Sequence, residues 1–166
     1  LAMSGIAGVT RLKRFHTFGI GESRADQMLG DMDVFKADGG IKLGFQAHYP
    51  QLETKLALRA DDEAALTALL APAEAEVRRR LGTFIVAEDD QTIEGVILGR
   101  LLASGSTLAI AETVTGGHLA ARIAPLPGAE RAFRRATIAR DLAELGATAV
   151  SPDQAAVVAK ALRASS

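Results

Sequence analysis

The amino-acid sequence predicts an α+β domain followed by an α/β domain. In the first 88 residues the expected elements run strand, helix, strand, strand, helix, strand, which is the order of a small α+β sandwich. The rest of the chain alternates helices with a strand, a pattern typical of the α/β class. A length of 166 residues accommodates two small domains. We expect them to cover residues 9–88 and 91–166.

The first three strands and a short helix are indicated by residues 11–59. Residues 11–18 alternate polar with apolar side chains, as a half-buried strand does. Residues 22–32 have helical periodicity, with Ser23 as the expected N-cap. Residues 41–48 and 52–59 follow a glycine turn and form an expected hairpin.

A long helix is expected to begin at Asp61 and Asp62, whose carboxylates cap it and complement the helix dipole. Its apolar stripe consists of Ala65, Leu66, Leu69, Leu70, Ala73, Val77 and Leu81. Pro72 lies inside this stripe, where proline can kink or split a helix. Gly82 ends the pattern, and residues 83–87 are expected to form a fourth strand.

The second domain is expected to be mostly helical. Residues 91–103, 115–124 and 129–145 have helical patterns, and a last helix begins at Ser151 with proline in its first position. The apolar residues 108–111 form the one clear strand. Because a single strand cannot make a sheet, this domain must take strands from elsewhere.

The turn after this strand is the strongest candidate for a site. Residues 112–117 read Glu-Thr-Val-Thr-Gly-Gly and lead directly into a helix. Gly116 and Gly117 let the backbone approach a ligand closely, and a helix N-terminus offers free N–H groups. An ordinary strand-to-helix turn with Thr115 as N-cap explains the same pattern, and both interpretations stay open.

Composition excludes several other classes of function. The chain has no cysteine, which rules out disulfides and thiolate metal sites and makes the cytoplasm the expected compartment. No apolar run is long enough to span a membrane. A net charge of −1 argues against a dedicated nucleic-acid binder. His16, His48 and His118 lack metal-ligand spacing, so we expect no metal.

Three segments resemble one protein family. Residues 15–23, Phe-His-Thr-Phe-Gly-Ile-Gly-Glu-Ser, resemble the start of the KH-like domain of the CinA (competence/damage-inducible) family, and residues 43–50 are similar to the hairpin that follows it. Residues 107–117 resemble the Ala-Glu-Ser-Cys-Thr-Gly-Gly signature of the family's C-terminal nicotinamide mononucleotide deamidase domain. The resemblance implies a KH-like βαββαβ sandwich followed by a partial three-layer α/β/α domain.

The resemblance also implies a chemistry that this chain has in part lost. In the family, a serine attacks the carboxamide of the nucleotide, assisted by a tyrosine and a lysine. Here Thr113 takes the serine position, and residues 136–145 lack both helpers. Without a base, a threonine hydroxyl is a poor nucleophile. The resemblance therefore implies a degenerate or inactive deamidase that needs no cofactor, with Thr113 as its catalytic position. The substrate-binding candidates in the turn are Glu112, Thr115, Gly116 and Gly117.

Residues 1–8 resemble a family strand and turn, Ala-Val-Thr-Gly-Ile-Ala-Gly-Pro, that belongs near the C-terminus. Either the match is accidental, or the chain is permuted or has a segment joined in front. If it is real, these residues complete the second domain, and Ser4, Gly5 and Gly8 join the substrate-binding set beside Thr113. A partner chain would supply the remaining strands, which predicts a homodimer.

Two functions remain as hypotheses. The first is a CinA-type fragment that acts on a pyridine nucleotide or descends from an enzyme that does. The second is a non-catalytic module for dimerisation and nucleotide binding within a larger CinA-type protein. Nucleic-acid binding through Arg11, Lys13 and Arg14 is the least favoured alternative.

Overall fold

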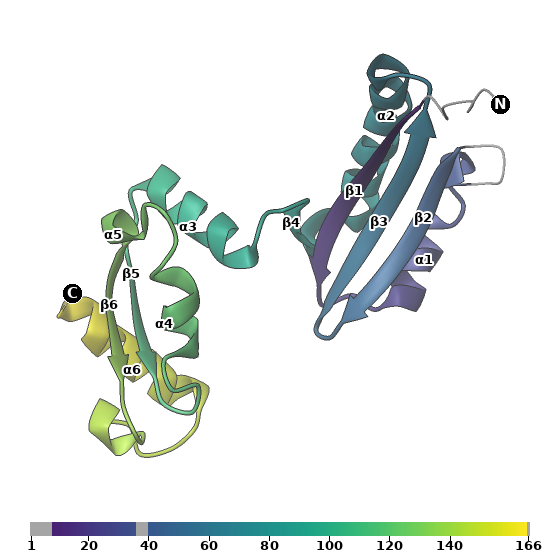
Figure 1. Cartoon of the computed structure of the whole chain (residues 1–166). Coiled ribbons are helices and arrows are strands. Elements are labelled where there is room, and N and C mark those ends of the chain that lie inside the picture. The colour runs from purple at the N-terminus through teal and green to yellow at the C-terminus, as the bar shows by residue number, and fades with distance from the viewer. Residues whose placement is uncertain (1–7, 36–39, 166) are drawn as a thin grey trace, which may run out of the picture. The chain divides into compact units, whose positions relative to one another are not determined.

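A computed structural model describes residues 8–35 and 40–165 of the chain. It divides into two compact units, with the boundary between Thr92 and Ile93 (Figure 1). Each unit has its own cluster of buried apolar side chains. The mixed α and β content agrees with the predicted fold class.

The first unit is a four-stranded antiparallel sheet in the order β2-β3-β1-β4. Its strands are β1 (Val9–Phe18), β2 (Ile41–His48), β3 (Gln51–Ala60) and β4 (Ile85–Glu88). The helices α1 (Glu22–Leu29) and α2 (Glu63–Leu81) lie together on one face of the sheet (Figure 1). Short 3-10 turns, η1 (Asp33–Phe35) and η2 (Gly82–Phe84), complete the unit. The predicted order of strands and helices is confirmed.

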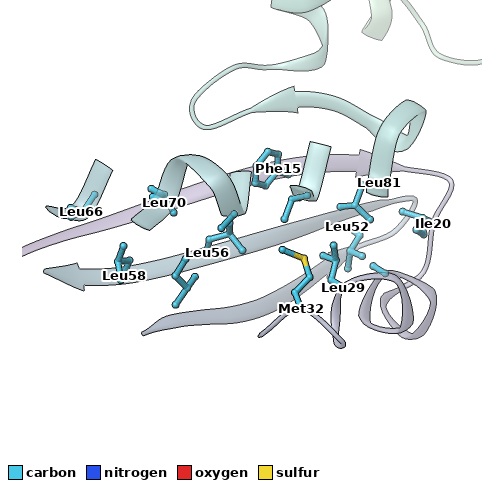
Figure 2. Close-up of a cluster of buried hydrophobic side chains, with 14 residues drawn as sticks. Phe15, Ile20, Leu29, Met32, Leu52, Leu56, Leu58, Leu66, Leu70 and Leu81 are labelled. Atoms are coloured by element: carbon cyan, nitrogen blue, oxygen red, sulfur yellow. The ribbon is translucent and has the colours of Figure 1, made fainter. Parts of the chain in front are cut away.

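Strand register places the core of this unit. β1 pairs with β3 from Val9–Ala60 to Phe18–Gln51, and β2 pairs with β3 along its whole length. Alternate side chains of β3 therefore face the helices and are buried. Figure 2 shows the core that they form with Phe15 and the leucines of α1 and α2. In the predicted stripe of α2, Leu66, Leu70, Ala73, Val77 and Leu81 are buried, whereas Leu69 is 49% exposed.

Four expectations about α1 and α2 have different outcomes. Ser23 is not a cap, because α1 begins after Gly21 with no side-chain cap. Asp62 caps α2 as predicted, since its carboxylate accepts a hydrogen bond from the backbone N–H of Ala65 at 2.8 Å. Pro72 does not split α2, which is continuous because its buried stripe packs on the sheet on both sides of that residue. Gly82 ends the helix with φ +48°, a backbone conformation that favours glycine.

The second unit contains a two-stranded parallel sheet, formed by β5 (Leu108–Glu112) and β6 (Phe133–Ile138). The expected helix over residues 129–145 is wrong. Helix α5 covers only Ala129–Ala132, β6 follows, and a 3-10 turn η3 (Ala143–Leu145) comes later. Pairing with β5 outweighs the helical propensity of this alanine-rich stretch. One missing strand thus lies within the chain itself.

The remaining helices of the second unit flank this sheet. They are α3 (Ile93–Ser104), α4 (His118–Ile123) and α6 (Pro152–Ala164). Both α4 and α6 pack on β5. Helix α6 begins as predicted: Pro152 takes the first turn, and the Ser151 hydroxyl accepts a hydrogen bond from the N–H of Gln154 at 3.2 Å. The buried cluster is formed by Leu98, Ala129 and Ala132.

Candidate functional site

The candidate site is the turn that joins β5 to α4. Gly116 and Gly117 have φ values of +59° and +92°, in the left-handed region that favours glycine. Gly117 is the N-cap of α4, so the expectation that Thr115 caps this helix is wrong. A Cβ atom on Gly117 would lie 2.7 Å from Cδ1 of Ile138, at the end of β6. The turn therefore needs glycine for both conformation and space.

Glu112 holds the turn together. Its side chain is buried at the end of β5, and its carboxylate accepts three hydrogen bonds. The donors are the Thr115 hydroxyl at 2.5 Å, the Ala120 N–H at 2.8 Å and the Leu119 N–H at 3.0 Å. The Thr115 hydrogen bond, with those from the two backbone groups, lowers the pKa of Glu112, although burial acts in the opposite direction. The carboxylate of Glu112 thus satisfies the N–H groups of Leu119 and Ala120 in the first turn of α4.

Thr113 lies on a groove that runs along β5. The groove has a volume of about 470 Å³, and α6 forms its opposite wall. It extends from Thr107, before β5, to Thr113, after it. Most of its lining is alanine, leucine and valine, and among the described residues that line it Arg163 is the one that is ionisable. Within the described part of the chain, no carboxylate, imidazole, amine or phenol therefore lines this groove.

The predicted site residues fall into three groups. Glu112, Thr113, Thr115, Gly116 and Gly117 come together in one turn. Ser4 and Gly5 lie outside the described residues. Gly8 lies against Arg59 and Ala60, in the first unit.

Sequence reasoning missed three residues of the groove: Ser151, Gln154 and Arg163. Ser151 and Gln154 are three residues apart at the start of α6, so they share a helix face. That spacing is a signal in the sequence, but it becomes relevant only once α6 is known to pack on β5.

Residues 8–35 and 40–165 contain neither a candidate metal site nor a candidate membrane-spanning helix. No three His, Asp or Glu side chains gather there in a way that would hold a metal ion. Within the same residues, no helix combines the length and hydrophobicity needed to cross a bilayer.

Comparison with known proteins assigns both halves of the chain. Residues 12–87 match the family model of the damage-inducible protein CinA KH domain, and residues 90–142 match that of the CinA C-terminal domain. A CinA-like protein of Frankia casuarinae is 34% identical over 161 residues, which cover 96% of this chain and 37% of the relative.

Two further relatives agree. A CinA-like protein of Geobacter metallireducens is 37% identical over 124 residues, covering 75% of this chain and 30% of the relative. A putative competence-damage inducible protein of Symbiobacterium thermophilum is 42% identical over 126 residues, covering 75% of this chain and 28% of the relative. The chain thus spans roughly a third of the length of its curated relatives. These matches confirm the resemblance seen in the sequence motifs, and the chain belongs to the CinA family, with a KH domain followed by a C-terminal domain.

Proposed function

We propose that the second unit binds a nucleotide carrying a carboxamide, of the pyridine-nucleotide class, and does not hydrolyse it. The observation that carries this proposal is the position of Thr113. Its side chain lies on a groove of ligand size, at the position of the family's serine, but none of the described residues that line the groove can act as a general base. We therefore expect this chain to bind the nucleotide but not to hydrolyse it.

The groove offers features that suit such a ligand. Its volume of about 470 Å³ lies within the usual range for small-molecule pockets, about 300–1,000 Å³. Apolar side chains provide a surface for an aromatic ring. Thr113, Ser151 and Gln154 provide hydroxyl and amide groups for hydrogen bonds to a carboxamide. Arg163 provides a positive charge for a phosphate.

Hydrolysis would need a group that takes the proton of the Thr113 hydroxyl. Arg163 stays protonated at physiological pH and cannot do so. Glu112 is adjacent in sequence, but its carboxylate already accepts three hydrogen bonds, and its pKa is lowered. A carboxylate stabilised in its charged form is a weak base. We therefore expect no measurable deamidation.

The test combines a binding measurement with an activity assay. The purified chain is titrated with nicotinamide mononucleotide by calorimetry, and ammonia release is followed in parallel. We expect saturable binding without ammonia. Thr113→Trp should fill the groove and abolish binding, whereas Val114→Trp should not, because the Val114 side chain is fully exposed.

Two results would contradict the proposal. Ammonia release that disappears in Thr113→Ala would mean that the domain is an active amidase. Absence of binding in the folded wild-type chain would mean that the groove does not take this ligand.

As part of the same proposal, we place the protein in the cytoplasm, where pyridine nucleotides would reach it. Cell fractionation tests this location.

A second candidate function is that of an assembly module for a larger CinA-type protein. It is favoured by the sheet of the second unit, which has only two strands in the described part of the chain. This candidate predicts self-association that does not depend on nucleotide.

A further inference from the structure

The sheet of the first unit has one face that the helices of this unit leave open. Phe15 and Leu56 point toward α1 and α2 and are fully buried (Figure 2). Successive side chains of a strand point to opposite faces, so the neighbours of these two residues point away from the helices. Both α1 and α2 lie on the buried face (Figure 1). The open face is therefore made by alternate residues of β1, β2 and β3.

Basic side chains gather at one end of the open face, which we call the basic end. Arg14 lies opposite Lys55 in the register of β1 and β3, and Arg59 lies four residues after Lys55. Lys42 of β2 lies beside the segment of β3 between Lys55 and Arg59. The one carboxylate at the open-face positions of these three strands is that of Glu53. Its Oε1 lies 3.2 Å from Nε of Arg14 and 3.7 Å from Nζ of Lys55, so positive charge is left in surplus.

Flat rings occupy the other end of the open face. Phe18 of β1 and His48 of β2 lie on either side of Gln51 of β3, in one row across the sheet. His16 is the next open-face residue of β1. Phe18 is 50% exposed, and His48 is exposed as well. A half-exposed phenyl ring close to imidazole rings offers a surface on which another flat ring can stack.

Small side chains lie between these two ends. Gly44 of β2 lies opposite Lys55, and Ala57 is the next open-face residue of β3. A Cβ atom on Gly44 would meet no other atom within 4 Å. Glycine inside a strand weakens it, and it often marks a place where a ligand or another backbone comes close. An extended ligand therefore has room to cross the face from the basic end to the rings.

The net charge of −1 hides the charge of this face. Most carboxylates of the first unit lie in α1, α2 and the segments that adjoin them, and few lie in the strands. The unit is therefore polarised, with a local positive potential that the total does not reveal. The sequence suggests three basic residues for nucleic-acid binding, but Arg11 pairs with a carboxylate of α2, and Lys13 is buried against Glu88 and Asp89. Arg14 is the one of the three on the open face.

We propose that the open face binds single-stranded DNA, with phosphates at the basic end and an unpaired base stacked on Phe18. A positive surface that follows the backbone, together with aromatic rings that stack on bases, is the usual means of binding a single strand. An acidic polypeptide has the charge without the rings, and a duplex keeps its bases inside the stack. The proposal concerns the first unit and does not depend on nucleotide binding by the second.

The floor of the face favours DNA over RNA. It is formed by Leu12, Gly44 and Ala57, whose side chains offer no hydrogen-bonding group. The 2′-hydroxyl of RNA needs such a partner when it leaves water, and a protein distinguishes RNA from DNA through this group. A strand that crosses this floor loses less without the hydroxyl.

The first experiment measures fluorescence anisotropy of a labelled oligothymidylate, about 16 nucleotides long, titrated with the full chain at several salt concentrations. We expect saturable binding that weakens as salt is added. Arg59→Gln should weaken binding about three- to tenfold and reduce the salt slope by about 0.7, because one phosphate contact is lost. Arg79→Gln is the matched control. It removes the same charge from the solvent side of α2 and should leave the affinity within about twofold of the wild type.

Two further substitutions test the rings and the floor, with circular dichroism as the control for folding. Phe18→Leu keeps an apolar side chain but removes the ring, so binding should weaken about tenfold without a change in the salt slope. Gly44→Glu has room for its side chain and adds a negative charge to the floor, which should also weaken binding about tenfold. Gly44→Gln has the same size without the charge and should bind more tightly than Gly44→Glu.

Several results would overturn the proposal. Absence of binding at low salt would do so, as would equal losses in Arg59→Gln and Arg79→Gln. An affinity that Phe18→Leu leaves unchanged would mean that no base stacks there. A duplex that binds as tightly as the single strand would reduce the effect to charge alone, and tighter binding of oligouridylate would make RNA the occupant. Displacement of the DNA by polyglutamate at equal charge would point to an acidic polypeptide.

Discussion

Replacing Glu88 with glutamine should remove much of the acid sensitivity of the first unit. Glu88 ends β4 and lies between Arg78 of α2 and Lys13 of β1. Its carboxylate accepts hydrogen bonds from Arg78 at 2.8 and 2.7 Å, and Nζ of Lys13 lies 2.6 Å away. The hydrogen bonds from Arg78, supported by Lys13, outweigh burial and lower the pKa of Glu88 to about 2.

The size and sign of the effect follow from this pKa. A drop from 4.5 to about 2 corresponds to about 3 kcal/mol of stabilisation of the folded state. Because Arg78 is 43% exposed, solvent screening reduces this to about 1–2 kcal/mol. The carboxylate is depressed in the folded state, so its contribution is complete above pH 4.5. It is lost progressively as the pH falls from 4.5 toward 2.

Urea denaturation at pH 6 and pH 3 measures this loss, with amide NMR signals of β1 reporting on the first unit alone. Because pH 3 lies between the two pKa values, only part of this contribution is lost there, and the wild type should lose about 1 kcal/mol more than Glu88→Gln between pH 6 and pH 3. Glu76→Gln is the matched control. The pKa of Glu76 is also lowered to about 2, by hydrogen bonds from Arg79 and Arg80, but these pairs lie on the solvent side of α2. Equal losses in the wild type and Glu88→Gln would refute the reasoning.

Three further substitutions test other parts of the chain. Gly117→Ala should destabilise the second unit by about 1–2 kcal/mol in thermal denaturation, because Gly117 has a positive φ and because the added Cβ would contact Ile138. Adding Ile138→Ala to this variant should restore only the part of the stability that is lost through the contact. Pro72→Ala should stabilise the first unit by about 1–3 kcal/mol in urea denaturation, because it restores a hydrogen bond in α2. Glu112→Gln should lower the melting temperature at pH 7. The difference from the wild type should shrink as the pH falls below 4.5, because the pKa of Glu112 is lowered in the folded state and its carboxylate stabilises that state only while it is charged.

The first unit could be predicted from sequence because its signals are local. Alternation in β1, the hairpin of β2 and β3 and the cap at Asp62 each depend on residues close in the chain. Strand β6 could not be predicted in this way. Its sequence, Phe-Arg-Arg-Ala-Thr-Ile, follows an alanine-rich helix start and becomes a strand only by pairing with β5, more than twenty residues earlier.

The candidate site was predictable in part for the same reason. The motif located the turn and its glycines, because their positions depend on local backbone conformation. The motif did not indicate that the carboxylate of Glu112 would be occupied by Thr115 and by the first turn of α4, since the same residue types also suit a ligand. The groove could not be predicted without knowing that α6, some forty residues later in the chain, packs on β5.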